Sequence, residues 1–349
     1  MPRTPGGGQP TIVSIAERAE VSIASVSRVL NGLGARRETV ERVERAASEL
    51  GYVPNAVARS LKGGRTRQLT FAMPDIGNPV YVAMVRAIQS VAKAAGYRLL
   101  LHSTDAVVDD ELAVLRSLGD RTSDGLIICP IRITDAHIEA LRTAAGPVVV
   151  IGSLPDGAPV DSVRADSVAG AILAVRHLYD TGRRRIAFVN GPFDTVPGRN
   201  RAKGYRAALA QCGLAYDSAL VVHTDFGIDA GAEAAGQLLA DPASRPDAVF
   251  CANDQLALGV ARTLHSAGLR IPQDVAVAGM DDSLLAQAGW PPLTSVDLGS
   301  TARGRHAAEF LLQRLGQASD APEVSTPRTT TAPPRLVVRA STAHTATDR

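Results

Sequence analysis

The sequence predicts a small all-α unit at the N-terminus, followed by a larger α/β region. Two short helical patterns occupy residues 11–31, whereas apolar runs alternate with helical patterns from Leu69 onward. Such alternation is typical of parallel sheets that helices cover on both faces. Residues 1–68 carry eleven Lys or Arg and six Asp or Glu, while the rest of the 349-residue chain carries 26 and 29. Only the first part is therefore an electrostatic partner for phosphate.

The N-terminal unit starts with two capped helices joined by a tight turn. Thr11 and Ser22 are typical N-caps, and Val26 and the apolar residues after it are spaced to face a core. A small, polar helix face of this kind fits a DNA major groove. An ordinary helical hairpin is the alternative for this pattern alone. The residues left for a partner are Ile23, Ala24, Ser27 and Arg28.

A third helix is expected from Arg37 to Leu50. The stretches VSIASVSRVLNG (21–32) and ELGYVPNAVARSL (49–61) resemble the helix-turn-helix headpiece of the LacI/GalR (lactose-repressor) family of transcription regulators. The resemblance implies that Asn55 to Leu61 forms a hinge helix, ordered only when two copies pack on DNA. It also implies that Leu61 wedges into the minor groove and kinks the duplex. A buried helix residue is the alternative for Leu61.

The same resemblance assigns base reading to Ile23, Ala24 and Arg28, and phosphate contacts to Ser22, Ser25, Asn31 and Tyr52. The turn after the first helix carries Glu20 where glycine is frequent in the family, which costs about 1 kcal/mol if φ is positive there. The residues expected to contact DNA are Thr11, Ser22, Ile23, Ala24, Ser25, Ser27, Arg28, Asn31, Tyr52, Asn55, Ala58, Arg59 and Leu61.

The larger region contains too many strand and helix units for one doubly wound domain, so we expect two similar lobes that share a cleft at the carboxyl ends of their strands. The expected strands are 69–73, 97–102, 125–129, 148–151, 185–189, 248–251 and 275–278. The expected helices include 81–95, 168–179, 201–211, 230–239 and 255–267.

This region resembles the effector-binding core of the same family, which is related in fold to periplasmic sugar-binding proteins. The matching stretches are PDIGNPVY (74–81), SDGLIICP (123–130), GRRRIAFVNGP (182–192), ANDQLALG (252–259), VAGMDD (277–282) and PPLTSV (291–296). The segment 336–341 also looks like the family's final strand. The resemblance thus covers residues 11–342, with a headpiece at 11–54, a hinge helix and linker at 55–68, and a core at 69–342. Residues 1–10 and 343–349 are expected to be disordered tails.

A hydroxyl-rich ligand needs carboxylate and amide groups, an arginine and an apolar or aromatic floor. Arg199 matches the family arginine that grips ligand hydroxyls, Phe226 an aromatic wall, and Tyr81 the floor of the first lobe. For Asp254 and Asp282, roles as helix caps or hydrogen-bond anchors stand equally beside ligand binding. The expected effector-binding residues are Tyr81, Arg199, Phe226, Asn253 and Asp281.

Several positions depart from the family pattern. Gly152 and Ser153 stand where many members have aspartate and arginine, and Val80 and Ser300 stand where aromatic residues are common. A standard hexose is therefore less assured as the ligand. These departures keep open a DNA-binding protein whose core has lost its ligand.

The sequence supports no enzyme class. The paired aspartates at 109–110 and 281–282 have no basic partner at motif spacing, and no nucleophile elbow or phosphate-binding loop follows a strand. Cys129, Cys212 and Cys251 are odd in number and far apart, which is typical of buried small residues in a reducing compartment. No cofactor and no metal is expected.

The sequence thus predicts a cytoplasmic transcription regulator, most simply a repressor. It is expected to bind a pseudo-palindromic double-stranded DNA operator as a homodimer and to respond to a small-molecule effector, a sugar or sugar derivative. A solute-binding protein of a transporter is the alternative from another class. It would have a signal peptide and no basic headpiece, and no apolar run of membrane-spanning length occurs here. The tail after 338 contains no leucine heptad for tetramers.

Overall fold

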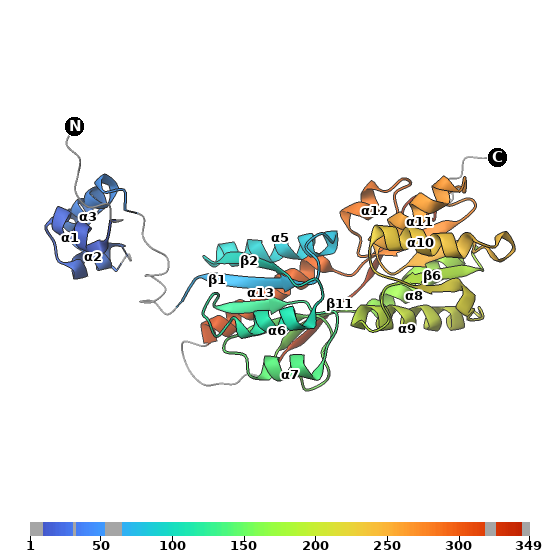
Figure 1. The fold of residues 1–349 in the computed structure, drawn as a ribbon, viewed down its shortest axis with the longest axis horizontal. Coiled ribbons are helices and arrows are strands. Elements are labelled where there is room, and N and C mark those ends of the chain that lie inside the picture. Colours follow the sequence, from blue (N-terminus) through green and yellow to red (C-terminus); the bar gives the residue numbers. More distant parts are fainter. Residues whose placement is uncertain (1–9, 31–32, 53–64, 318–325, 344–349) are drawn as a thin grey trace. The chain divides into compact units, whose positions relative to one another are not determined.

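The computed structural model describes residues 10–30, 33–52, 65–317 and 326–343. The chain divides into two compact units, residues 1–66 and 67–349, each of which has its own core (Figure 1). The predicted hinge helix at 55–61 lies outside the described residues. The same is true of the predicted DNA contacts Asn31, Asn55, Ala58, Arg59 and Leu61.

The headpiece, residues 10–52, consists of the three predicted helices. They are α1 (Ile12–Ala19), α2 (Ile23–Leu30) and α3 (Arg37–Glu49). Thr11 caps α1, since its hydroxyl accepts from the Ser14 amide while the Ser14 hydroxyl accepts from the Thr11 amide. The Ser22 hydroxyl accepts from the Ser25 amide at 3.1 Å, as its predicted capping role requires. The buried core of the headpiece is Ile15, Ala16, Ala19, Val26, Val43 and Ala46.

Polar contacts fasten α1 to α3. Arg18 pairs with Glu49 at 2.6 Å, and the Arg42 guanidinium donates to the carbonyl oxygens of Ala19 and Glu20. Glu20 ends α1 in the left-handed region, with φ 52° and ψ 46°. The condition for a backbone cost at this position, a positive φ, is therefore met, and Arg42 bonds to the Glu20 carbonyl.

The first lobe of the core is a fully parallel sheet in the order β11-β5-β4-β3-β1-β2. Leu69 and Phe71 of β1 face one hydrophobic cluster with α5 and α13, whereas Ala72 faces a second cluster with α6 and α7. The strands are β1 (Gln68–Met73), β2 (Arg98–Ser103), β3 (Gly125–Ile128), β4 (Val148–Ile151), β5 (Asp161–Ala165) and β11 (Thr329–Ala332). The helices are α5 (Pro79–Ala94), α6 (Val108–Arg116), α7 (Asp135–Arg142) and α13 (Ser300–Gln317).

The second lobe repeats the plan with the order β12-β10-β9-β8-β6-β7, in which only β12 is antiparallel to its neighbour. Its strands are β6 (Ile186–Asn190), β7 (Val221–His223), β8 (Ala248–Cys251), β9 (Ala276–Met280), β10 (Thr294–Asp297) and β12 (Arg335–Val337). Its helices are α8 (Ser167–Asp180), α9 (Val196–Gln211), α10 (Ile228–Leu239), α11 (Asp254–Ser266) and α12 (Leu284–Ala288). Figure 1 shows the two lobes of the core, one around β1 and one around β6.

The chain crosses between the lobes three times. The crossings follow β5, β10 and β11, and they place α13 and β11 in the first lobe although both come after the second lobe in sequence. The final strand is shorter than predicted for 336–341. It ends at Val337, because Arg339 and Ser341 instead bond back to the Thr294 segment of β10.

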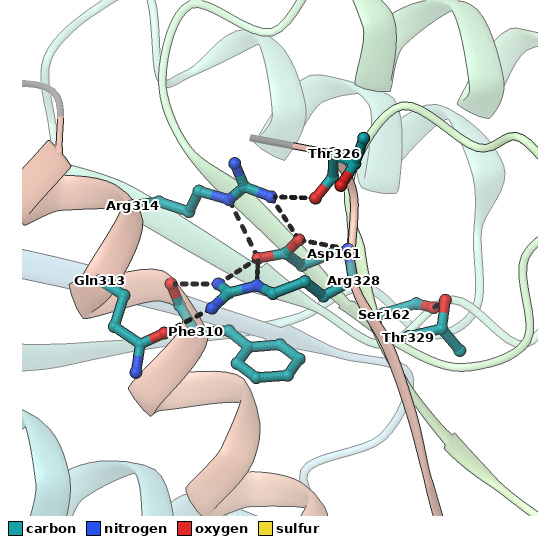
Figure 2. Close-up of polar contacts among 8 residues, drawn as sticks. All are labelled: Asp161, Ser162, Phe310, Gln313, Arg314, Thr326, Arg328 and Thr329. Atoms are coloured by element: carbon teal, nitrogen blue, oxygen red, sulfur yellow. Dashed lines mark hydrogen bonds and ion pairs between the residues drawn. The ribbon is translucent and has the colours of Figure 1, made fainter. Parts of the chain in front are cut away.

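A buried carboxylate secures the returning strand β11 (Figure 2). Asp161, at the start of β5, accepts hydrogen bonds from Arg314 of α13 and from both the amide and the guanidinium of Arg328. Its side chain is fully buried, and its shortest contacts with the two guanidinium groups are both 2.6 Å. One carboxylate therefore joins β5, α13 and the residue before β11.

Candidate functional sites

The exposed face of α2 is the first candidate site. Val26 is fully buried, and Val29 and Leu30 pack on the headpiece core. Ser22, Ile23, Ala24 and Arg28 are exposed, while Ser25 and Ser27 are half-buried. The predicted division of α2 into a core face and an exposed face is confirmed for the other residues, whereas Ser27, predicted to be available to a partner, is half-buried. The exposed face is small enough to lie deep in a groove.

Two other predicted DNA contacts lie at helix ends of the headpiece. Thr11 is exposed at the start of α1, where its hydroxyl is used in the cap. Tyr52 is half-buried after α3, with its ring against the headpiece core and its amide bonded to the Ala47 carbonyl at 2.9 Å. Both residues thus also stabilise the fold of the headpiece.

The second candidate site is a pocket of about 400 Å³ in the core. Residues that follow strand ends line it in both lobes, including Pro74 after β1, Pro130 after β3, Asn253 after β8 and Asp281 after β9. The crossing segments contribute as well, through Ala165 and Leu298 among others. The predicted shared cleft at the carboxyl ends of the strands is thus present, and its volume suits a small molecule.

Tyr81, Phe226 and Asn253 line the pocket as predicted. A Cβ at Gly191 would lie 2.1 Å from the Phe226 ring, so the glycine makes room for this aromatic wall. The Asn253 side chain also makes two hydrogen bonds within the second lobe. Its Oδ1 accepts from the Leu256 amide at the start of α11, and its Nδ2 donates to the Phe226 carbonyl at 3.0 Å. Asn253 therefore positions the aromatic wall while it faces the pocket.

Arg201 lines the pocket, whereas Arg199, which the sequence predicted, does not. Both lie on α9. Arg199 is exposed and donates to the Asp194 carbonyl at 2.8 Å, whereas Arg201 is buried with Ala202 and Tyr205. The helical period turns Arg199 away from the pocket. The α9 arginine in the pocket is therefore Arg201, two residues after the predicted Arg199.

Asp281 lies opposite Arg201, and its Oδ1 is 3.6 Å from the Nη2 of the guanidinium. Its backbone has φ 105°, and its amide donates to the Val296 carbonyl of β10. Burial raises the pKa of Asp281, and the charges of Arg201 and Arg303 oppose that rise. Asp281 lines the pocket, and its role as an acceptor for a ligand stays a prediction.

A second arginine in the pocket, Arg303 of α13, was not predicted. It is buried and donates to the Ser300 hydroxyl at 3.3 Å. Ser300 itself is buried at the start of α13, at a position identified in the sequence only as a missing aromatic residue. Its spacing of three residues from Arg303, one helical turn, was the available signal for this arginine.

Asp254 and Asp282 are anchors within the second lobe. The Asp254 carboxylate accepts from the Ser295 hydroxyl and from the Ser283 amide, and Asp282 pairs with Arg339 at 2.5 Å. Burial, followed by the charge of Asp281, raises the pKa of Asp254 to about 7. Neither aspartate lines the pocket.

Direct contacts join the lobes beside the pocket. Arg132, after β3, makes two hydrogen bonds to the carboxylate of Asp194, which precedes α9, at 2.7 and 3.2 Å. The Val196 amide donates to the Ile131 carbonyl at 2.8 Å. The lobes therefore meet along this edge, and a change in their separation would break these bonds.

Within the described ranges, no helix has the length and apolar character needed to cross a membrane. Among the same residues, no group of three or more His, Cys, Asp or Glu side chains is placed to hold a metal ion.

Known proteins match both units. Residues 11–55 match the family "Bacterial regulatory proteins, lacI family", and residues 175–342 match "Periplasmic binding protein-like domain". Catabolite control protein A of Priestia megaterium is 35% identical over 303 residues, which cover 84% of this chain and 90% of that protein.

Two solved structures cover almost all of the chain. The lac repressor dimer bound to operator and the anti-inducer ONPF has a TM-score of 0.83 at 29% identity, over 96% of this chain and 99% of that one. A complex of the transcriptional regulator CelR with cellobiose has a TM-score of 0.71 at 33% identity, over 95% and 99%. The headpiece, the two-lobed core and these similarities together show that the chain belongs to the lacI family of bacterial regulatory proteins. It is a DNA-binding transcriptional regulator.

Proposed function

We propose that this regulator is a repressor that binds a pseudo-palindromic operator as a homodimer and changes its affinity when a small hydroxylated effector enters the core pocket. It acts on chromosomal DNA in the cytoplasm and carries out no catalysis. The observation that carries the proposal is the combination, in one chain, of an exposed α2 face and a pocket with buried charged groups between two lobes.

The α2 face supports sequence-specific binding. Arg28 is exposed and can donate two parallel hydrogen bonds to a guanine edge, while Ile23 and Ala24 are small enough to let the helix approach the bases. The predicted contacts of the hinge helix, Leu61 included, would add discrimination by kinking the duplex.

The pocket supports an effector. It contains an aromatic wall, Phe226, beside the Asp281 carboxylate and the Arg201 guanidinium, a combination that suits the apolar faces and hydroxyl groups of a sugar-like ligand. The Nε of Arg201 is buried and has no hydrogen-bond partner among the described residues. Arg164 and Arg183 have the same unmet Nε outside the pocket. What favours a ligand-binding core over one that has lost its ligand is that the charged side chains of Arg201 and Asp281 are kept almost buried in the pocket.

Exposed apolar side chains on the core support a second copy of the chain as the partner. Leu284 and Trp290 of the second lobe are 70% and 88% exposed, and Leu101 is exposed on the edge strand β2 of the first lobe. A two-fold dimer would cover such residues and present two headpieces to mirrored half-sites.

Selection from random-sequence DNA with the full chain tests the DNA-binding part. We expect enrichment of a sequence with two inverted half-sites. Arg28→Ala should reduce the discrimination between that sequence and a scrambled one by about 1 to 3 kcal/mol. Arg45→Ala removes an equal charge from the exposed face of α3 and should leave discrimination intact. Failure to enrich any sequence would overturn the proposal, and undiminished discrimination by Arg28→Ala would remove Arg28 as a base reader.

A further inference from the structure

Two buried guanidinium groups from opposite lobes line the effector pocket. Arg201 belongs to α9 of the second lobe, and Arg303 belongs to α13, which packs in the first lobe. Both residues are 7% exposed. The Nε atoms of both lack a hydrogen-bond partner among the described residues, but so do those of Arg164 and Arg183 outside the pocket. The two pocket arginines differ in their charge partners: Arg201 lies 3.6 Å from Asp281, whereas Arg303 donates to the neutral Ser300 hydroxyl. Buried cations are normally paired with an anion, so Arg303 leaves charge for a ligand.

Carboxylates inside the pocket balance only one of these charges. Asp281 is buried beside Arg201. The other two carboxylates that line the pocket, Asp75 and Asp105, are exposed at its rim. Both carboxylates accept hydrogen bonds within their own loops, Asp75 from the Gly77 amide and Asp105 from the Ser103 hydroxyl.

Other acidic groups near Arg303 do not neutralise it. Burial raises the pKa of Tyr81 well above its ordinary value and that of Cys129 to about 12, so both are uncharged at neutral pH. Asp297, at the crossing after β10, accepts from the Gly299 amide and lies 3.7 Å from Arg335. Burial lowers the pKa of Arg303, but a guanidinium stays protonated at neutral pH. The interior of the pocket therefore holds about one unbalanced positive charge.

We propose that the effector is an anion: a small polyhydroxylated molecule that carries a carboxylate or a phosphate, with Arg303 as the residue that selects the anionic group. This inference rests on the proposed effector role of the pocket. Arginine binds carboxylate and phosphate through two parallel hydrogen bonds. Asp281 with Arg201 then serves the hydroxyl groups, and the Phe226 ring packs against the apolar face of the carbon skeleton.

The placement of the arginines also links this anion to lobe closure. Arg201 and Arg303 repel each other when the lobes approach, and the charge of Arg201 contributes to the lowered pKa of Arg303. An anion between them replaces this repulsion by two attractions. The anion therefore stabilises the arrangement in which both lobes contact the ligand.

Calorimetric titration of the full chain with matched acidic and neutral compounds tests the inference. The carboxylate pairs are glucuronate with glucose, galacturonate with galactose, and gluconate with glucitol, and the phosphate pair is glucose 6-phosphate with glucose. At least one acid should bind about 10 to 100 times more tightly than its neutral partner, as expected for a charged hydrogen-bonding group. The arm that responds identifies the anion as carboxylate or phosphate.

Three variants test whether Arg303 causes the preference for the acid over its neutral partner. Arg303→Met should abolish the preference for the acid, and Arg303→Lys should retain part of it, which separates loss of charge from loss of folding. Arg199→Met is the matched control, because Arg199 is exposed outside the pocket, and it should behave like the wild type.

Neutral compounds that bind as tightly as their acids, or a preference that survives in Arg303→Met, would overturn the inference and leave the effector role intact. If no compound of either set bound, the result would count against the proposed effector role and against this inference with it.

Discussion

The guanidinium of Arg201 and the carboxylate of Asp281 face each other at 3.6 Å inside the core pocket. Arg201 belongs to the second turn of α9, and Asp281 directly follows β9, so the pair joins a helix to the carboxyl end of a central strand of the second-lobe sheet. The distance exceeds that of a direct hydrogen bond, which leaves both groups able to contact a ligand.

The pair predicts the effect of substituting Arg201. For the compound that binds the wild type most tightly, Arg201→Met should weaken binding by about 1.5 to 3 kcal/mol, the range for hydrogen bonds to charged groups. Calorimetric titration measures this change in binding free energy. Arg199→Met, two residues earlier on the same helix, should leave binding unchanged. The reverse result, with Arg199 required and Arg201 dispensable, would restore the assignment made from the sequence.

The buried carboxylate in Figure 2 predicts a loss of stability. Asp161→Asn leaves Arg314 and Arg328 without their shared anion, and the free energy of unfolding of the core should fall by about 3 kcal/mol. Urea unfolding followed by circular dichroism measures the change. Ser162→Ala removes the adjacent neutral hydrogen bond to Thr329 and should cost only about 1 kcal/mol. Equal losses in the two variants would show that the carboxylate has no special role.

The left-handed conformation of Glu20 predicts a gain in stability. Glu20→Gly removes a backbone strain of about 1 kcal/mol and loses only an exposed contact with Arg42, so the headpiece should become more stable by about 0.5 to 1 kcal/mol. Hydrogen exchange of the α1 to α3 amides in the full chain reports this change. Glu17→Gly, inside α1, should instead lower protection. Lower protection in both variants would show that Glu20 is not strained.

Asp254 predicts a particular dependence of stability on pH. Its pKa is about 7 in the folded chain, against an ordinary value of 3.8. Between these values the folded state holds a proton that the unfolded state has released. The free energy of unfolding therefore falls as pH rises through this window, by up to about 1.4 kcal/mol per pH unit.

Urea unfolding at pH 5, 6, 7 and 8 measures the effect. Wild type should lose stability with rising pH relative to Asp254→Asn, and the difference should level off above pH 7. Asp274→Asn is the control, because hydrogen bonds from Arg270 lower the pKa of half-buried Asp274 and confine its titration to acid pH. Parallel curves for wild type and Asp254→Asn would contradict the raised pKa.

The sequence predicted those parts of the fold that depend on local patterns. The α2 face, the capping by Thr11 and the apolar strands such as β1 and β4 could be identified, because periodicity and caps are local signals. Strands β5, β7, β10 and β11 were not predicted. Of these, β5 reads DSVRA and β11 reads TTTA, and the two pair with each other across more than 150 residues of the chain. Long-range pairing and the ion pairs of Asp161 stabilise them.

The candidate site shows the same limit. Tyr81, Phe226, Asn253 and Asp281 follow strands or start helices, so their common location could be predicted. The choice between Arg199 and Arg201 required the orientation of α9, in which the i, i+4 pair of Arg201 and Tyr205 marks the buried face. For Arg303 the sequence offered only its spacing of one helical turn from Ser300, and its place in the pocket depends on the crossing that brings α13 back to the first lobe.

The most direct test of the account is the affinity of the full chain for its selected operator, measured by fluorescence anisotropy with and without the compound that binds the pocket most tightly. If the core pocket governs DNA binding by the headpiece, a saturating concentration of the compound changes operator affinity by about 5- to 150-fold. Arg201→Met should lose this response and keep operator binding. An operator affinity that stays the same with the pocket filled would contradict the claim.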